Sequence, residues 1–379
     1  MLLFALTITA LIGALVVVVA AGLVVRKISF ILRTNREATL DDFYLQRLNP
    51  LLLEDFPQGK LDPDSLLFRQ HCQKIFEPLR LELSRLGYFK RRVHRAALKR
   101  VALGMSDELV GETRSRLTQA FKIFGFVTEG LNDLNSRRWW VRAKACRSLA
   151  LMRAEEATAD FVLLLKDDEE DVRTEAAMAL MAISGITALR PLFANLQRVS
   201  VWMSIQLSKV ILPMGSRAVP HLVEGLKSGQ QSIMHFCAEM LGSIGDIAAC
   251  EPLVAAANTR DTGLRSKTFL AIGKLGDERG KETLLEGLSD EDEECRTCAA
   301  LGLGYLGSPD TGEQLKDHLL RDTIAVRLAS GKSLARLEDW GRDILISAFR
   351  EADAIGKRVI RQFLDEVGVD GPTLEGEPL

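Results

Sequence analysis

Two overlapping motifs in residues 295–307, CRTCAALGLGYLG, have the residue types and spacing of reactive sites. Cys295 and Cys298 form a C-x-x-C pair, a spacing used by redox-active thiols. A G-x-G-x-x-G pattern follows at Gly302, Gly304 and Gly307. Taken alone, the stretch predicts a redox pair beside a dinucleotide-binding turn. That interpretation depends on the surrounding elements, because a dinucleotide fingerprint needs a strand before it and a helix after it.

The surrounding sequence is organised by a repeat of about 31 residues. One column of this repeat holds Met234 and the arginines Arg142, Arg173, Arg265, Arg296 and Arg327. The residue before this column is apolar in most units, the third after it is small, and the seventh and tenth after it are apolar. Offsets spaced four, four and three mark one face of an α-helix. A second apolar helix follows, as in EPLVAAA, so each unit is predicted to be a helical hairpin.

A hairpin of this length cannot bury its apolar face alone, so successive hairpins must stack. The columns resemble HEAT repeats, particularly the short type first noticed in phycobilin lyases, in the stretches DVRTEAAMALMAI, GLRSKTFLAIGKLGD and ECRTCAALGLGYLGS. The resemblance covers roughly residues 137–350 and implies an all-α fold, an α-solenoid of about seven HEAT-like hairpins. It implies little about function, because such solenoids have many roles. The third unit, near Trp202 and Pro213, lacks the arginine, which indicates either a bend in the stack or harmless drift.

The repeat gives a different interpretation of the two motifs in residues 295–307. Gly304 shares a column with Gly242 and Gly273, where a small residue lets helices pack closely, and Gly307 stands at a helix end that favours a left-handed cap. No strand precedes these glycines. Cys295 occupies an apolar column, which predicts a buried and inert thiol, whereas Cys298 is predicted to be more exposed and is the one thiol worth testing for reactivity.

The arginine column has two interpretations, an anion-binding ladder and a structural ladder. Similar HEAT solenoids use an Asp and an Arg near the start of this helix to join adjacent units. Here Asp171 with Arg173, and Asp261 or Glu294 with other arginines, would have that role. We favour the structural ladder over the anion-binding one.

The N-terminus is a separate segment. Residues 2–25 contain no charge and as a helix would span about 36 Å, enough to cross a bilayer. No basic residue precedes the run, unlike in a cleaved signal peptide, and Arg26 and Lys27 follow it. We therefore predict a single uncleaved transmembrane anchor at 1–26, with the N-terminus outside and the repeats in the cytoplasm. The six cysteines are spread through helical patterns and are predicted to be reduced.

Helix-breaking residues and hydrophobic patterns divide the rest of the chain. Residues 27–61 are predicted to be a juxtamembrane connector in which Pro50 breaks any helix. Residues 62–136 are predicted to form an atypical helical cap on the solenoid, starting at Asp62 as N-cap and including a helix over 117–134. The repeats then occupy 137–352, and 353–379 form a C-terminal helix and tail.

Seven basic residues and no acidic one lie in residues 85–100. The candidate membrane-surface patch within this stretch is Lys90, Arg91, Arg92, Arg95, Lys99 and Arg100. Three interpretations remain: a solvated helix face met by acidic neighbours, a patch on anionic inner-membrane lipid, and a nucleic-acid site. The last is least favoured, because the net charge is −2 and the repeats contain the acidic run SDEDEE.

A second candidate surface is the start of the first clear repeat, NSRRWWVRAK, which contains Arg137, Arg138, Trp139 and Trp140. Adjacent tryptophans at this position favour a seal between the cap and the solenoid. Tryptophan and arginine are also the residues enriched in protein-binding hot spots, so these four form the best candidate partner surface.

No catalytic, cofactor or metal arrangement is recognisable. No histidine is followed by glutamate, as in the iron-binding pairs of the HEAT-like deoxyhypusine hydroxylase, and neither a P-loop nor a G-x-S-x-G is present. The sequence therefore predicts a membrane-anchored cytoplasmic scaffold that binds protein partners and neither cofactor nor nucleic acid. A bacterial inner membrane, and a membrane enzyme or transport assembly as partner, are implied by resemblance alone. The alternatives are an enzyme of the phycobilin lyase or isomerase type and a nucleic-acid-binding HEAT-like protein.

Overall fold

The computed structural model describes residues 26–27, 34–54 and 62–368, and within these ranges every regular element is a helix. The chain divides into two compact units, residues 1–157 and 158–379. The predicted anchor at 1–26 lies outside the described residues except for Arg26. So does the tail beyond residue 368.

The first unit is a bundle of helices. It comprises a helix over 34–53, α2 (Leu66–Arg85), α3 (Tyr88–Met105), α4 (Gly111–Ile123), α5 (Phe126–Leu134) and α6 (Trp139–Leu151). Its core is rich in aromatic residues, and Phe68, Phe76, Phe121 and Phe126 are almost fully buried. This bundle covers the predicted connector and cap, and its last helix, α6, lies in the predicted repeat region.

The connector prediction was wrong at Pro50, because the helix over 34–53 runs through it. A proline in a helix costs about 3 kcal/mol through its missing N–H and its clash with the preceding turn. Tyr44, Leu48 and Leu52 recur every four residues on one face and are buried. Arg116 of α4 donates to the carbonyl oxygen of Leu52 at 3.2 Å, which satisfies one of the last carbonyls of the helix. Tertiary packing therefore overrides the local signal.

Two further boundaries differ from the prediction. Helix α2 starts at Leu66 with Ser65 as its N-cap, whose hydroxyl accepts a hydrogen bond from the Phe68 N–H at 3.1 Å, so Asp62 is not the cap. The predicted helix over 117–134 is two helices, α4 and α5, because Gly125 between them has a φ of 72°. Only glycine adopts this left-handed conformation without strain.

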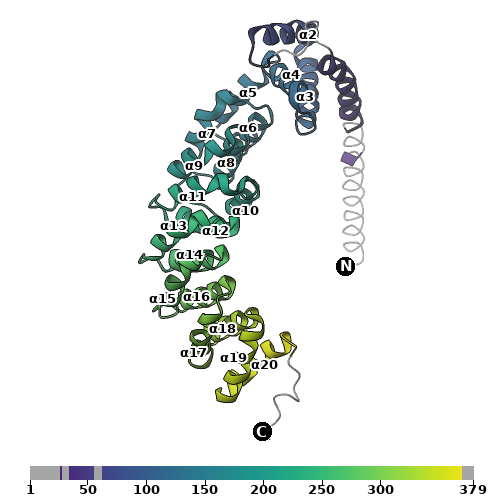
Figure 1. Cartoon of the computed structure of the whole chain (residues 1–379). Coiled ribbons are helices and arrows are strands. Elements are labelled where there is room, and N and C mark those ends of the chain that lie inside the picture. The colour runs from purple at the N-terminus through teal and green to yellow at the C-terminus, as the bar shows by residue number, and fades with distance from the viewer. Residues whose placement is uncertain (1–25, 28–33, 55–61, 369–379) are drawn as a thin grey trace, which may run out of the picture. The chain divides into compact units, whose positions relative to one another are not determined.

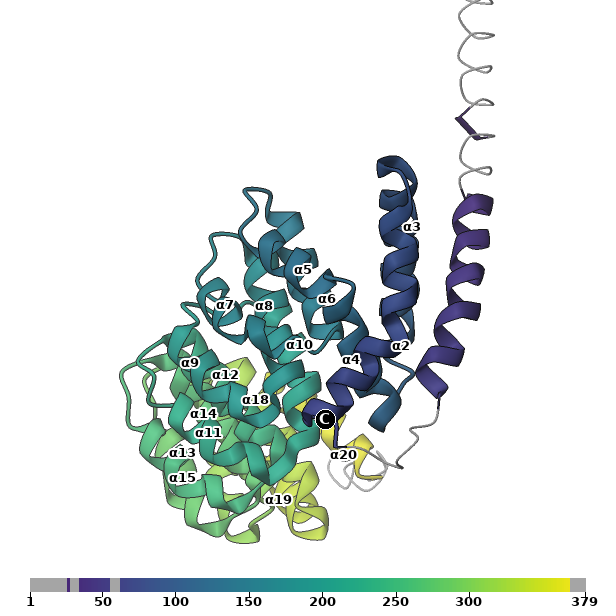
Figure 2. The same ribbon diagram turned by 90° about the horizontal axis from the view of Figure 1, so that it is seen from above.

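The second unit is a stack of antiparallel helix pairs (Figures 1 and 2). Helices α8, α10, α12, α14, α16 and α18 lie in one row, and α9, α11, α13, α15 and α17 lie in the other. The bounds are α7 (Thr158–Leu164), α8 (Glu170–Ser184), α9 (Leu189–Asn195), α10 (Val201–Ile211), α11 (Val219–Gly225), α12 (Gln231–Ile244), α13 (Cys250–Ala257), α14 (Thr262–Leu275), α15 (Lys281–Gly287), α16 (Glu293–Leu306), α17 (Gly312–Arg321), α18 (Ile324–Arg336), α19 (Glu338–Glu351) and α20 (Ala354–Glu366). Short 3-10 turns join the two helices of several pairs.

Glycines set the spacing between neighbouring helices of the first row. A Cβ on Gly273 of α14 would collide with the backbone of Gly302 in α16, and one on Gly242 would lie 2.6 Å from the Ala271 Cα. Gly245, Gly276 and Gly307 end α12, α14 and α16 with φ near 70°. Both roles predicted for the repeat glycines are confirmed.

Among the described residues, one segment has the length and apolar character of a membrane span, Glu170–Asn195. Half of its most apolar window is buried inside the structure. The segment is interrupted at Gly185, where α8 ends, and continues as α9 of the same pair. Its apolar character therefore reflects the core of the repeat stack.

Candidate functional site

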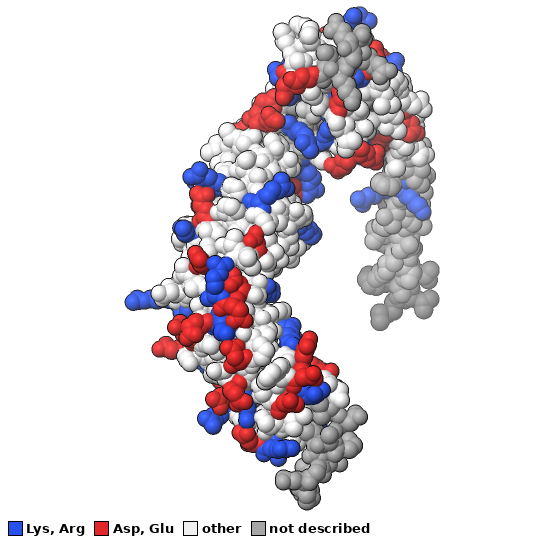
Figure 3. All heavy atoms as spheres, viewed as in Figure 1, with Lys and Arg blue, Asp and Glu red and all other residues white. Residues whose placement is uncertain are grey.

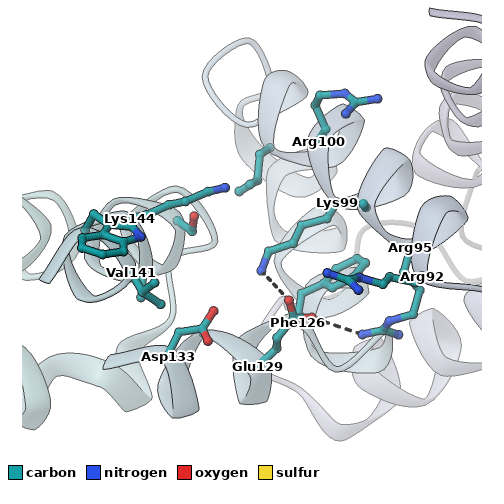
Figure 4. Close-up of a pocket in the computed structure, with 15 residues that line it drawn as sticks. Arg92, Arg95, Lys99, Arg100, Phe126, Glu129, Asp133, Val141 and Lys144 are labelled. Carbon is teal, nitrogen blue, oxygen red and sulfur yellow. Dashed lines mark hydrogen bonds and ion pairs between the residues drawn. The ribbon is translucent and has the colours of Figure 1, made fainter. Parts of the chain in front are cut away.

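A groove of about 790 Å³ opens in the first unit between α3, α5 and α6 (Figure 4). This volume is in the range of ligand and peptide pockets. Its charged lining residues are Arg92, Arg95, Lys99, Arg100 and Lys144, opposed by Glu129 and Asp133. Its apolar lining includes Leu103, Phe126, Trp140 and Val141. We call this feature the α3–α6 groove.

The groove brings together the two surfaces that the sequence predicts separately. Four residues of the basic patch line it from α3, because positions 92, 95, 99 and 100 recur with helical spacing on one face. Trp140 lines it from α6. Residues about 40 positions apart in the sequence therefore share one concave surface, which no local pattern could have indicated.

One internal carboxylate neutralises part of the basic wall. Glu129 of α5 accepts from the Lys99 Nζ at 3.2 Å and from an Arg95 Nη at 3.4 Å, as the dashed lines in Figure 4 show. Arg95 also donates to the Phe124 carbonyl at 2.8 Å, and its guanidinium lies 4.9 Å from the centre of the Phe126 ring. Arg95 and Lys99 thus have an acidic neighbour, as the solvated-face interpretation expects.

Arg100 also lines the groove but is held by another helix, whereas Lys90 and Arg91 are not among its lining residues. Arg100 makes a two-pronged ion pair with Asp41 at 2.7 and 2.8 Å, and these hydrogen bonds raise the pKa of the guanidinium. Arg91 donates to the Leu86 carbonyl at 3.1 Å. Lys90 is exposed at the start of α3.

Two cations of the groove are left without a carboxylate partner within the described chain. Arg92 of α3 and Lys144 of α6 are both exposed and lie on opposite walls. Figure 4 shows the Lys144 side chain extending from α6 towards the space in front of α3. The lining thus carries five basic and two acidic side chains, which leaves the groove positively charged.

Lys144 was not among the residues singled out from the sequence, although a signal for it exists. It lies four residues after Trp140, which places the two on one face of α6.

The tryptophan pair lies on the surface. Trp139 is 38% exposed and Trp140 is 54% exposed, and their rings meet edge to face at 6.0 Å. The Arg138 guanidinium lies 5.8 Å from the Trp140 ring centre, and Arg137 is exposed beside it. Such exposure does not fit a buried seal, and it leaves an amphipathic anchor available at the rim of the groove.

The arginine column in the second unit forms a ladder of ion pairs between successive pairs of helices. Arg265 binds Asp290 with two hydrogen bonds of 2.8 Å, and Arg296 binds Asp322 with two of 3.0 Å. Arg327 binds Asp353 at 3.1 Å. Each of these guanidiniums is occupied by a carboxylate, which gives it a structural role.

The acidic partners differ from those expected from the sequence. Asp261, expected to bind an arginine, instead contacts His235 at 2.9 Å and caps α14. Arg173 donates to the backbone carbonyls of Asp167 and Asp168, and Arg142 donates to that of Ser136. The partner aspartates lie about 26 residues downstream, just before the next helix of the row. The pairing is therefore set by contacts between successive repeats, which the sequence pattern does not show.

The C-x-x-C pair does not form a reactive site. Cys295 is fully buried, and burial raises the pKa of its thiol to about 12. Cys298 is partly exposed, yet burial and then the nearby Glu294 raise its thiol pKa to about 11. Neither thiol is activated as a nucleophile at neutral pH.

The face of the second unit visible in Figure 3 shows basic and acidic side chains intermixed. It therefore presents no continuous basic stripe of the kind that a nucleic acid needs. In the part of the chain that the structure describes, no group of three or more His, Cys, Asp or Glu side chains is placed to hold a metal ion.

Comparisons with known proteins agree with this architecture. Residues 128–203 and 251–335 match the HEAT repeats family. Among curated proteins, none matches this sequence. A crystal structure of a Kap121p mutant aligns with a TM-score of 0.54 at 13% identity, covering 88% of this chain and 42% of that protein. At that identity the likeness shows the fold alone.

Two other structures superpose less well. An engineered protein aligns with a TM-score of 0.37 at 17% identity, over 86% of this chain and 100% of its own. The CpcE–CpcF complex of phycocyanin lyase from a Nostoc species aligns with a TM-score of 0.29 at 16% identity, over 64% of this chain and 94% of its own. The described part of the chain is therefore all-helical, and the stretches 128–203 and 251–335 within it are similar to HEAT repeats.

Proposed function

We propose that this protein is a membrane-anchored scaffold whose repeats lie in the cytoplasm and whose α3–α6 groove and neighbouring tryptophans bind a protein partner. One observation carries this proposal: an exposed pair of tryptophans lies at the rim of a positively charged groove. Tryptophan and arginine provide the largest share of binding energy in protein interfaces. HEAT repeats, an architecture built to present extended surfaces, support the same function.

The membrane part of the proposal comes from the uncharged run at residues 2–25 and the basic residues that follow it. An anchor of this kind would confine the groove and its partner to one plane. Confinement raises their effective concentration without any new contact. A partner that is itself a membrane protein gains most from this arrangement.

Affinity purification of the full chain from membranes tests partner binding. Replacing both Trp139 and Trp140 with alanine is expected to abolish recovery of the partner while leaving the melting temperature within a few degrees of the wild type, because both side chains are exposed. Trp340→Ala is the matched control, since that tryptophan is 67% exposed on α19 of the second unit. Equal recovery in all three proteins would contradict the proposal.

Tag accessibility in intact spheroplasts tests the topology separately. A C-terminal tag is expected to be protected from added protease and to become cleavable only after the membrane is lysed. Cleavage of that tag in intact spheroplasts would show that the repeats lie outside.

A further inference from the structure

Resting on the proposed function, we infer that the α3–α6 groove binds an acidic segment of the partner, with spaced carboxylates that pair with Arg92 and Lys144 and apolar side chains that pack on Trp140. The groove thereby becomes a specific recognition site for a peptide chain.

The charge pattern of the groove defines the ligand. Part of the charge at its centre is already offset, because the single carboxylate of Glu129 binds both Lys99 at 3.2 Å and Arg95 at 3.4 Å. The unmatched charges are Arg92 on one wall and Lys144 on the other. A ligand that complements them needs two negative groups set apart, with uncharged atoms between them.

The apolar lining fits what must lie between those charges. Phe126, Val141 and Trp140 line the same groove, and Trp140 is more than half exposed. Acidic side chains separated by apolar ones in a peptide reproduce this alternation. Aromatic rings at the rim supply contact area at a small entropic cost, since their side chains have few rotamers.

A nucleic acid is disfavoured by the same pattern. Its phosphates follow one another densely, and a dense polyanion would meet the carboxylates of Glu129 and Asp133 inside the groove.

A lipid headgroup is disfavoured by the direction of α3. The helix over 34–53, which follows the predicted anchor, pairs antiparallel with α3, because Arg100 binds Asp41 and the Tyr44 hydroxyl lies 2.8 Å from the His94 Nδ1. Arg92 therefore lies about 12 Å along α3 beyond Arg100, away from the end of that helix nearest the anchor. The Debye length over which anionic lipid attracts a cation is about 8 Å, so a lipid surface at that end of α3 would attract Arg100 more strongly than Arg92.

The test uses the full chain in nanodiscs of neutral phosphatidylcholine. The probe is a fluorescein-labelled peptide of repeating Glu-Ala-Leu, and its control replaces each Glu with Gln. Fluorescence anisotropy is expected to show at least about tenfold tighter binding of the acidic peptide, and a loss of about tenfold or more in Arg92→Glu/Lys144→Glu. Arg92→Lys/Lys144→Arg should retain binding, and so should Lys166→Glu/Arg217→Glu, which changes exposed cations of the second unit.

Three results would overturn the inference: equal binding of both peptides, equal loss in the control variant, or complete loss of peptide binding in discs that contain phosphatidylglycerol. The last result would assign the groove to lipid. Affinity purification with Arg92→Glu/Lys144→Glu separates this inference from the proposed function. If the partner is still recovered with that variant, the scaffold function stands and the acidic-segment inference fails. If no partner is recovered with the wild type, the proposed scaffold function itself fails.

Discussion

Single side chains in this protein are governed mainly by burial and by their ionic neighbours. The cysteines show the effect of burial, since five of the six are buried and Cys298 is partly exposed. Desolvation penalises a thiolate, so burial raises the thiol pKa of Cys72 and Cys298 to about 11. A C-x-x-C spacing therefore has no chemical meaning until the helix that carries it is known.

Thiol labelling of the native protein provides a residue-scale prediction. A pKa of about 11 leaves Cys298 mostly protonated at pH 7.4, so iodoacetamide should modify it roughly a hundredfold more slowly than free cysteine. The rate should rise as the pH is increased towards 10. Mass spectrometry of the Cys298 peptide measures this rate, with the denatured chain as the fast reference. Native labelling as fast as in the denatured chain would show that the thiol is activated or exposed.

The ion-pair ladder makes a second residue-scale prediction. Burial alone would raise the pKa of Asp322, but hydrogen bonds from Arg296 and His318 hold it at about 2, below its ordinary 3.8. A depressed carboxyl pKa stabilises the fold above the unfolded pKa, and this contribution is lost as the pH falls from about 4 to 2. Asp322→Asn should lower the free energy of unfolding by about 2 kcal/mol at pH 7 and by progressively less below pH 4.

Denaturant unfolding of the full chain at several pH values measures that difference. Asp339→Asn is the matched control, because Asp339 pairs with Arg342 while 84% of its side chain is exposed, and surface ion pairs contribute little. A constant difference between wild type and Asp322→Asn from pH 7 to pH 2 would contradict the assignment.

At the scale of elements, small residues decide how closely the helices pack. Gly273→Ala would place a methyl group against the backbone of Gly302, which cannot move away without shifting α16. The variant should lose about 1–3 kcal/mol of stability through overpacking. Gly104→Ala in α3 is the control, because no atom lies within 4 Å of its added methyl group, and it should gain up to about 1 kcal/mol. Unfolding midpoints compare the two, and equal shifts would argue against close packing at Gly273.

Element boundaries show where local sequence patterns succeed and fail. The repeat predicted the helices of the second unit and the glycines that end several of them, because the same pattern recurs in successive hairpins. The part of the first unit before residue 128 has no repeat. There the predictions failed at Pro50, where buried side chains keep the helix intact, and at Asp62, where Ser65 is the cap. A single proline or capping residue predicts a helix boundary poorly when no repeat supports it.

The candidate site depended on packing more than on pattern. Basic residues of α3 and the tryptophans of α6 were visible in the sequence as separate features. Only the bundle brings Arg92 and Trp140 onto one groove and adds Glu129, whose carboxylate binds two of the cations. The ladder shows the same limit, since the arginines were identified and their aspartate partners were not.

The whole molecule consists of two compact units, residues 1–157 and 158–379. Repeats supply a regular second unit, tied by Arg–Asp pairs and closely packed glycines. The first unit carries the predicted anchor, the groove and the tryptophans Trp139 and Trp140. We therefore expect the partner to bind the unit that contains the predicted anchor, and the repeats to offer a second binding surface.

Photo-crosslinking in living cells tests the central claim of partner binding at the groove most directly. Benzoylphenylalanine is placed at Trp140 in one strain and, as a control, at Leu163, which is 71% exposed on α7 of the second unit. We expect irradiation to join the Trp140 variant to a membrane protein through an acidic segment, and we expect the Leu163 variant not to form this product. The absence of any crosslinked protein at Trp140, or the same products from both positions, would contradict it.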